Sequence, residues 1–284
     1  MAGRIGIIFD MDGVLYRGSE PVEGARELVR FLKENGIPFI FLTNNSTKDP
    51  AMYREKLLSM GIDVPEEAIV TSGLATRLYM EGHFEPGKVF VVGGKGLRME
   101  MERLGWGGVI DVDGGARNGL WREVKYVVVG LDPPDLTYEK LKYAALAIRD
   151  RGAKFIGTNP PDTTYPAEEG LYPGAGSIIA ALKASTGVEP PLIIGKPNEP
   201  AYEVAKGKLD AEEVWMVGDR LDTDIAFARR FGMKAILVLT GVSTLKDVEE
   251  TGIKPDLALP SVRELLDYLK VTLGGALNET RGAP

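Results

Sequence analysis

The chain has 284 residues, of which 44% are hydrophobic and 26% charged, ordinary values for a globular protein with a full hydrophobic core. The formal net charge of −7 argues against binding to nucleic acid or to an anionic membrane. Cysteine is absent and histidine occurs once, at His83. This composition excludes disulfides, thiolate nucleophiles and multi-histidine metal sites, and it argues against a Ser-His-Asp triad. Any chemistry must therefore use carboxylates, lysine, hydroxyls, amides or an oxygen-ligated cation.

The first residues lack the hydrophobic region of a signal peptide, and no stretch approaches the roughly 18 apolar residues that a membrane helix requires. We therefore expect a cytoplasmic protein with no membrane partner. The sequence leaves a homodimer open.

Alternating strand and helix patterns begin at once. Residues 5–9 form an all-apolar run, typical of a strand that is buried on both faces of a parallel sheet. In chain order we then expect a helix at 23–34, a strand at 38–42, a helix at 53–60, a strand at 68–71 and a helix at 75–80. Strands that alternate with helices predict βαβ units and a doubly wound sheet.

The same alternation returns near the other end of the chain. Here we expect strands at 192–194, 214–217 and 235–239, separated by helices at 200–206 and 224–231. The intervening stretch has its own elements, namely strands at 88–92, 126–129 and 154–156 and an amphipathic helix at 138–149.

This organisation predicts an α/β protein in which a doubly wound, Rossmann-like parallel-sheet core is interrupted by an inserted α/β cap domain. Residues 1–82 and 191–270 would form the core, residues 83–190 the cap, and residues 271–284 a frayed tail.

Four polar motifs follow predicted core strands. They are Asp10-Met11-Asp12-Gly13, Thr43-Asn44-Asn45, Gly195-Lys196-Pro197 and the run from Gly218 to Asp224 that contains Asp219. In an open α/β sheet, ligands bind beyond the carboxyl ends of the strands, so these motifs should converge.

Residue types alone then suggest phosphate chemistry. One of Asp10 and Asp12 can attack phosphorus, while the other donates a proton to the leaving oxygen and later takes one from water. Asp219 and Asp224 add negative charge that a hard divalent cation would offset, and Mg²⁺ suits phosphate chemistry. In addition, Thr43 and Lys196 could bind phosphate oxygens.

A rival first motif occurs at Asp111-Val112-Asp113-Gly114, and a rival second motif at Gly157-Thr158-Asn159. We prefer Asp10 because a clean apolar strand precedes it, whereas the strand before Asp111 is short and broken by glycine. The interpretation of Asp111 and Asp113 without a catalytic role is that they lie in an exposed turn of the cap. Thr158 and Asn159 could still face a substrate from the cap.

Taken together, DMDGVLY, FLTNNS, GKP and GDRLDTDI resemble the haloacid dehalogenase-like phosphohydrolases. The likeness covers almost the whole chain and is to the 4-nitrophenylphosphatase-like branch, which has a large α/β cap and includes phosphoglycolate and pyridoxal-phosphate phosphatases. The resemblance implies Asp10 as the nucleophile and Asp12 as the acid/base. It implies Asp10, the Asp12 carbonyl and Asp219 as Mg²⁺ ligands with Asp224 in support, and Thr43, Asn44 and Lys196 as phosphate binders.

The cap should then select the substrate, a small phosphorylated metabolite. Tyr165-Pro166 stands where pyridoxal-phosphate phosphatases carry His-Pro, which puts pyridoxal phosphate in doubt as the substrate. Tyr165 could stack on a ligand or hydrogen-bond to it, or simply be a packed surface residue. The expected function is hydrolysis through an aspartyl-phosphate. The alternatives are a phosphotransferase or mutase on the same core and a non-catalytic phosphate-binding protein.

Overall fold

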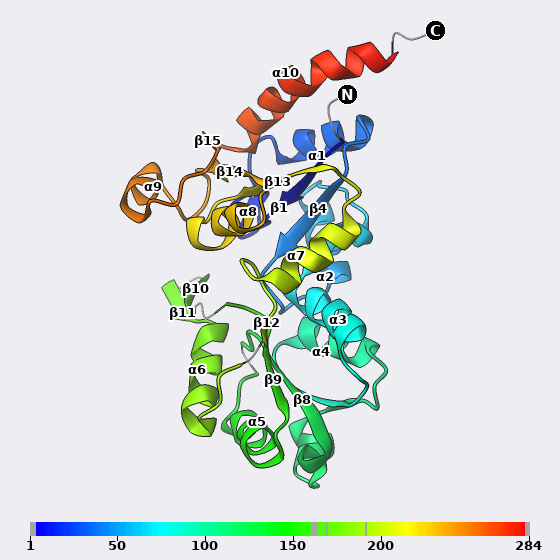
Figure 1. Cartoon of the computed structure of the whole chain (residues 1–284), viewed down its shortest axis with the longest axis vertical. Helices are drawn as coiled ribbons and strands as arrows, with labels where there is room; N and C mark the ends of the chain where they lie inside the picture. Colours follow the sequence, from blue (N-terminus) through cyan, green and yellow to red (C-terminus); the bar gives the residue numbers. More distant parts are fainter. Residues whose placement is uncertain (1–3, 134, 161–163, 168–169, 191, 282–284) are drawn as a thin grey trace. The chain divides into compact units, whose positions relative to one another are not determined.

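The computed structural model describes residues 4–133, 135–160, 164–167, 170–190 and 192–281 (Figure 1). The chain divides into two compact units. The first contains residues 1–42, 54–69 and 205–284, and the second contains residues 43–53 and 70–204. The predicted insertion, 83–190, lies within the second unit, and its boundaries as a cap domain stay a prediction.

A six-stranded sheet forms the core of the first unit. Its order is β15 (Leu257–Leu259), β14 (Lys234–Val238), β13 (Glu213–Gly218), β1 (Ile5–Phe9), β4 (Phe39–Thr43) and β5 (Ile69–Thr71). The central strand β1 pairs in parallel with β13 on one side and β4 on the other. Four of its five residues are buried, which explains its all-apolar sequence.

The chain adds strands to this sheet first on one side of β1 and then on the other. The chain passes outward from β1 through β4 to β5, then returns to the opposite side of β1 at β13 and continues outward through β14 and β15. Such a reversal is a topological switch point, where ligands bind beyond the carboxyl ends of the strands. The carboxyl ends of β1 and β13 therefore mark the first unit's candidate site.

Along the chain, the helices of the first unit lie between or after the strands of its sheet. They are α1 (Ala25–Glu34), most of α2 (Pro50–Ser59), α8 (Ala226–Arg230), α9 (Leu245–Thr251) and α10 (Val262–Arg281). A short hairpin, β2 (Tyr16–Arg17) with β3 (Glu20–Pro21), follows β1. Helix α10 extends to Arg281, and the predicted frayed tail, 271–284, stays a prediction. The Gly274-Gly275 pair lowers helix propensity by about 1 kcal/mol per glycine without forbidding a helix.

The second unit contains a parallel sheet of its own. Its order is β12 (Leu192–Ile193), β9 (Lys154–Gly157), β8 (Val124–Val129), β6 (Lys88–Val92) and β7 (Val109–Ile110). Its helices are α3 (Ser72–His83), α4 (Lys95–Arg103), α5 (Tyr138–Arg151), α6 (Ala175–Thr186) and the first part of α7 (Glu199–Lys208). A separate hairpin joins β10 (Thr164–Ala167) to β11 (Gly170–Pro173).

The strand at Leu192–Ile193 differs from its prediction. The sequence analysis assigned it to the first sheet, yet it pairs with β9 in the second, with Leu192 opposite Ile156. A two-residue apolar run carries no signal that distinguishes one parallel sheet from another. Lys196 therefore follows a strand of the second sheet.

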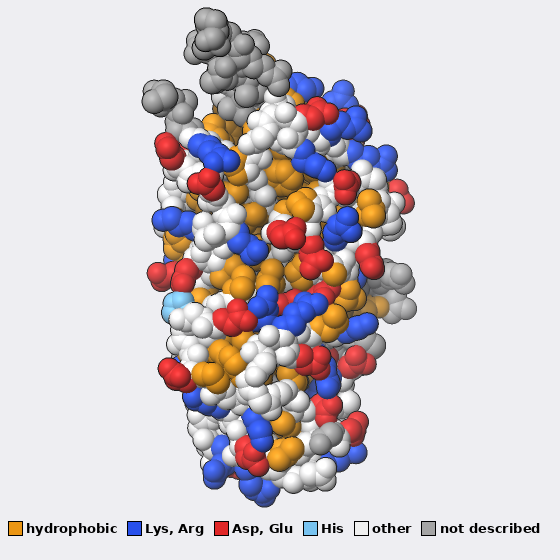
Figure 2. Space-filling model, turned by 90° about the vertical axis from the view of Figure 1, so that its right-hand side faces the viewer, with side chains coloured by type: hydrophobic (Ala, Val, Ile, Leu, Met, Phe, Trp, Pro, Cys, Tyr) orange, Lys and Arg blue, Asp and Glu red, His pale blue; other side chains and the backbone are white. Residues whose placement is uncertain are grey.

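The predicted fold class, a parallel α/β protein, is confirmed by both sheets. Within the described part of the chain, no helix is long and apolar enough to cross a membrane. Figure 2 shows acidic and basic side chains interspersed over the visible face, which lacks the broad basic field typical of nucleic-acid binding.

Truncation of the Phe155 side chain tests the packing of the second unit. The side chain is 1% exposed in a core cluster with Phe90, Val127 and Leu182. We expect Phe155→Ala to lower the free energy of unfolding by about 3–5 kcal/mol, because truncation leaves a cavity. Urea unfolding measures the change. The control is Tyr138→Ala at an 83% exposed position, with an expected effect within about 0.5 kcal/mol. Equal effects of the two variants would contradict this account of the core.

Candidate active site

The carboxyl ends of β1 and β13 carry the two aspartates that define the site. Asp10 directly follows β1, and its backbone N–H donates to the carbonyl of Val217 in β13 at 2.8 Å. Asp219 directly follows β13. The chain then forms a helical turn at Leu221–Ile225, which contains Asp224. All three aspartates belong to the first unit, at its topological switch point.

The carboxylates of Asp10, Asp219 and Asp224 converge. One oxygen from each lies within 4.8 Å of the others. Asp219 and Asp224 are buried, at 2% and 1% exposure, and Asp10 is half-buried. This donor set consists of hard oxygen atoms, which fit a divalent cation such as Mg²⁺ or Ca²⁺ better than a metal that prefers nitrogen or sulfur.

Asp219 is held by a loop that follows β14. Its Oδ2 accepts a hydrogen bond from the Val242 backbone N–H at 2.7 Å, and its carbonyl accepts one from Ser243 at 3.0 Å. A Cβ on Gly241 would lie 1.9 Å from Asp219 Oδ2, so only glycine lets the loop approach so closely. The backbone of this loop therefore helps to fix the Asp219 carboxylate.

Asp224 holds the backbone that leaves β13. Its Oδ2 accepts hydrogen bonds from the backbone N–H groups of Asp219 and Arg220, both at 3.2 Å. A Cβ on Gly218 would lie 2.2 Å from the Asp224 Cβ. Asp224 therefore both contributes to the acidic cluster and orients the segment that carries Asp219.

Asp12 lies in a tight turn after Asp10 and is exposed. The turn closes through a hydrogen bond from Gly13 N–H to the Tyr16 carbonyl at 2.8 Å. Gly13 adopts φ of 81°, and a Cβ there would meet Asp219 Oδ2 at 2.6 Å. The glycine of Asp12-Gly13 is therefore required both by the left-handed backbone and by the space that Asp219 occupies.

The predicted phosphate binders belong to the second unit, at the boundary with β4. Asn44 and Lys196 are joined by two hydrogen bonds: Asn44 Nδ2 donates to the Lys196 carbonyl at 2.9 Å, and Lys196 N–H donates to Asn44 Oδ1 at 2.8 Å. Thr43 and Lys196 are 7% and 1% exposed. Two residues that are 152 positions apart thus form one local structure.

The rival second motif supports this same loop. Asn159 Nδ2 donates to the Asn44 carbonyl, and the Ser72 hydroxyl donates to that carbonyl at 2.7 Å. Gly195 N–H donates to the Thr158 carbonyl at 3.1 Å. Thr158 and Asn159 therefore position Asn44 and Lys196 through their contacts.

The rival first motif is engaged in ion pairs of the second unit. Asp111 pairs with Arg98 at 3.0 Å, and Asp113 pairs with Arg117 at 3.0 Å. Among the described residues, Asp10, Asp219 and Asp224 form a group of carboxylates close enough together to hold a metal ion, and this group contains neither Asp111 nor Asp113. The choice of Asp10 over Asp111 as the nucleophile stays a prediction.

Tyr165, the candidate substrate contact of the predicted cap, and Asp132, in the loop after β8, each have a partner within the second unit. Tyr165 in β10 is half-buried and packs edge-on against Tyr172 in β11, with ring centroids 6.0 Å apart. In the loop after β8, Asp132 is buried and accepts a hydrogen bond from Lys140 at 2.8 Å. Burial raises the pKa of Asp132, although the Lys140 hydrogen bond and charge oppose this effect.

Sequence reasoning missed the loop Gly241–Ser243, which holds Asp219. A signal was available, because the hydroxyl residues Thr240, Ser243 and Thr244 lie just beyond the apolar strand β14. The rule that found Asp10 and Asp219, polar residues after a parallel strand, applies equally to this segment.

Two family models match the chain. Residues 7–107 match the model described as haloacid dehalogenase-like hydrolase, and residues 193–265 match the related model described as HAD-hydrolase-like. An acid sugar phosphatase of Staphylococcus aureus is 42% identical over 266 residues, which cover 93% of this chain and 97% of that protein. The chain therefore belongs to the haloacid dehalogenase-like hydrolases and is an enzyme of their phosphatase class.

Solved structures agree with this placement. A hypothetical protein from Pyrococcus horikoshii is 70% identical, with a TM-score of 0.89 over 94% of this chain and 100% of that one. A 4-nitrophenylphosphatase from Thermotoga maritima is 38% identical, with a TM-score of 0.80 over 93% of this chain and 96% of that one. These likenesses confirm the predicted family, its 4-nitrophenylphosphatase-like branch and its fold with a cap domain.

Gly241 offers a test of how Asp219 is held. We expect Gly241→Ala to push the Asp219 carboxylate from the cluster and to weaken Mg²⁺ binding about tenfold or more, since metal sites are sensitive to the groups that orient their ligands. Calorimetric titration with Mg²⁺ measures the affinity.

Gly207→Ala is the matched control, because nothing lies within 4 Å of a Cβ built there. This variant should bind Mg²⁺ like the parent protein. Unchanged Mg²⁺ affinity in folded Gly241→Ala would show that the loop does not position a metal ligand.

Proposed function

We propose that the protein is a Mg²⁺-dependent phosphatase that hydrolyses phosphate monoesters of small metabolites through an aspartyl-phosphate on Asp10. The observation that carries this proposal is the convergence of Asp10, Asp219 and Asp224 at the switch point of a parallel sheet. A bound Mg²⁺ would offset the negative charge of these carboxylates and of the phosphate. The Mycobacterium tuberculosis glycerol phosphate phosphatase, 30% identical with a TM-score of 0.81, was crystallised in complex with calcium.

Asp10 and Asp12 carry out the first chemical step. An Asp10 carboxylate oxygen attacks phosphorus, and the bond between phosphorus and the ester oxygen breaks as the new oxygen–phosphorus bond forms. Asp12 donates a proton to the departing oxygen, so the product leaves as an alcohol. The exposure of Asp12 is consistent with proton exchange with substrate and water.

Water completes the cycle. Asp12, now ionised, accepts a proton from a water molecule whose oxygen attacks the phosphorus of the aspartyl-phosphate. The bond to Asp10 breaks, which releases inorganic phosphate and restores both carboxyl groups to their starting states. Thr43, Asn44 and Lys196 would hold phosphate oxygens during both steps, and the paired hydrogen bonds of Asn44 with Lys196 would keep two of these groups in a fixed relation.

The substrate class is a small phosphorylated metabolite, with sugar phosphates as first candidates. Relatives are named acid sugar phosphatase, 4-nitrophenylphosphatase and glycerol phosphate phosphatase, names that share a phosphate monoester and differ in the leaving group. We also propose that the enzyme works in the cytoplasm, where such metabolites are made.

The covalent step is tested by Asp10→Asn. The amide is a poor nucleophile, so we expect phosphate release from 4-nitrophenyl phosphate in the presence of Mg²⁺ to fall at least about 10³-fold. Asp111→Asn is the matched control, because it alters the rival motif, and it should keep nearly full activity. Substantial turnover by Asp10→Asn would exclude Asp10 as the nucleophile. Transfer to an added alcohol without release of phosphate to water would instead indicate a phosphotransferase.

The role of Tyr165 is tested by a screen of phosphorylated metabolites, read as phosphate release. The screen should include sugar phosphates, phosphoglycolate, nucleoside monophosphates and pyridoxal phosphate. If Tyr165 contacts the leaving group, Tyr165→Ala should raise KM for the preferred metabolite about three- to tenfold while KM for 4-nitrophenyl phosphate changes less. Tyr172→Ala removes its ring partner and serves as the comparison. Equal changes in KM for all substrates would show that Tyr165 contributes only to packing.

A further inference from the structure

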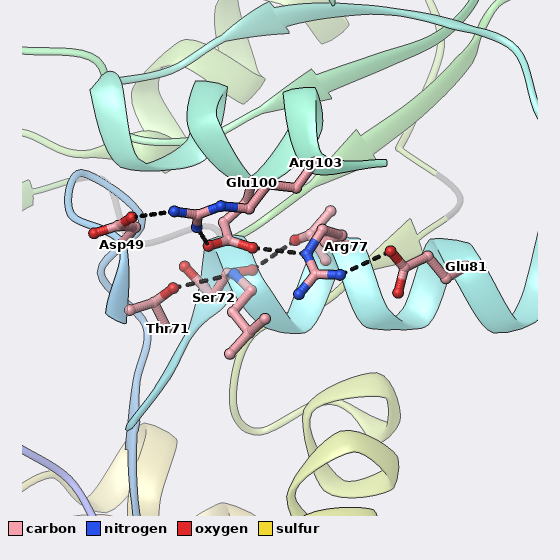
Figure 3. Close-up of polar contacts among 9 residues, drawn as sticks. Asp49, Thr71, Ser72, Arg77, Glu81, Glu100 and Arg103 are labelled. Carbon is pink, nitrogen blue, oxygen red and sulfur yellow. Dashed lines mark hydrogen bonds and ion pairs between the residues drawn. The ribbon is translucent and has the colours of Figure 1, made fainter. Parts of the chain in front are cut away.

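An ion-pair network of the second unit, with two buried carboxylates, contacts the loop Thr43–Asp49 at Asp49. Figure 3 shows Glu100 of α4 between two arginines, Arg77 of α3 and Arg103 of α4. Arg103 also donates to Asp49 Oδ2 at 2.7 Å, and Arg77 donates to Glu100 at 2.8 Å. Asp49 and Glu100 are each 1% exposed, so both carboxylates depend on these arginines for compensation of their charge.

Helix α4 holds the end of the loop that lies nearer to α2. Besides the Arg103 contact, the Gly96 N–H donates to the Thr47 carbonyl at 2.9 Å. A Cβ on Gly96 would lie 2.3 Å from the backbone carbon of Lys48, so the helix and the loop pack backbone against backbone. Asp49 also accepts a hydrogen bond from Met52 N–H at 2.9 Å, which caps the start of α2.

Helix α3 holds the end of the loop that carries Asn44. Ser72, the first residue of α3, donates to the Asn44 carbonyl at 2.7 Å. Within the loop, Asn45 Oδ1 accepts hydrogen bonds from Thr47 N–H and Oγ1 at 2.8 and 2.7 Å, which stabilise its central turn. Because Glu100 joins Arg77 of α3 to Arg103 of α4, the two helices that hold the loop are tied to one another.

We propose that Arg103, through Asp49 and Glu100, is a positioning residue that sets the place of the loop carrying the phosphate-binding residues Thr43 and Asn44. This inference rests on the proposed function, since it assumes that the loop binds the phosphate of the substrate. Arg103 itself touches no reacting atom. Thr43 and Asn44 can bind the phosphate only while their polar groups lie within hydrogen-bond distance of its oxygens, so a network that fixes the loop sets the affinity for phosphate more than the rate of the chemical step.

The test compares two arginines of the same helix. Arg103 and Arg98 both lie on α4, their side chains are 42% and 44% exposed, and each forms two ion pairs. Arg98 pairs with Glu102 and Asp111. Arg98→Met is therefore the matched control for Arg103→Met.

We expect Arg103→Met to raise KM for 4-nitrophenyl phosphate and Ki for inorganic phosphate about tenfold, with kcat within about threefold of the parent value. The Mg²⁺ concentration for half-maximal activity should not change, because the acidic cluster belongs to the first unit. Arg98→Met should leave KM and Ki within about twofold. Arg103→Lys should bring KM and Ki part of the way back to the parent values. Lysine restores the positive charge but cannot form the bidentate contacts of the guanidinium group.

A second variant covers the case in which Arg103→Met does not fold. Asp49→Asn keeps a good helix cap and removes the charge that Arg103 binds, so it should raise KM and Ki in the same direction. KM and Ki of the double variant, Arg103→Met with Asp49→Asn, should be no higher than those of the more affected single variant, because both substitutions remove the same interaction.

Parent-like KM and Ki in folded Asp49→Asn, or equal changes in Arg98→Met and Arg103→Met, would overturn the inference. A wrong proposed function would give a different result from a wrong role of Arg103. In that case the parent protein itself would release no phosphate from any ester in the screen.

Discussion

Three like charges gathered at one edge of a sheet set the main physical constraint on this protein. One carboxylate oxygen from each of Asp10, Asp219 and Asp224 lies within 4.8 Å of the others. At that distance and an effective dielectric constant of about 20, each ionised pair repels by about 3 kcal/mol. Burial of Asp219 and Asp224 adds a desolvation cost. A divalent cation bound by the three oxygens would relieve both costs and would allow a phosphate anion to approach a carboxylate.

The fold is arranged to keep these carboxylates together. Parallel strands β1 and β13 end at the same edge, and the backbone hydrogen bond from Asp10 to Val217 fixes their relation. Glycines at 13, 218 and 241 remove the side chains that would otherwise collide with Asp219 or Asp224. Backbone N–H groups hold the carboxylates of Asp219 and Asp224, whose oxygens are ligands suited to a hard divalent cation.

The acidic cluster could be predicted from sequence because each member follows a recognisable strand. A single rule, that polar residues after parallel strands converge, found Asp10 and Asp219 and would also have found Gly241–Ser243. The same rule could not decide which sheet receives Leu192–Ile193, because two apolar residues pair equally well in either. It also gave no hint of α4, whose sequence Lys95–Arg103 carries mostly charged residues and few apolar ones.

Contacts between distant residues set the other limit on prediction. Asn44 meets Lys196 across 152 positions, and Arg103 meets Asp49 across 54. Charged and amide side chains of this kind occur throughout the sequence, and no local pattern indicates which of them will pair. The motif at Thr158-Asn159 shows the same limit: it was recognised as a rival, yet its contact with Asn44 became evident only in the folded chain.

The most direct measurement is the position of a bound divalent cation. Crystals of the protein grown with Mn²⁺ in place of Mg²⁺ can be measured at the manganese absorption edge. The account predicts one anomalous peak per chain, bounded by carboxylate oxygens of Asp10, Asp219 and Asp224. A fully occupied peak elsewhere, or no peak at this cluster at saturating Mn²⁺, would contradict it.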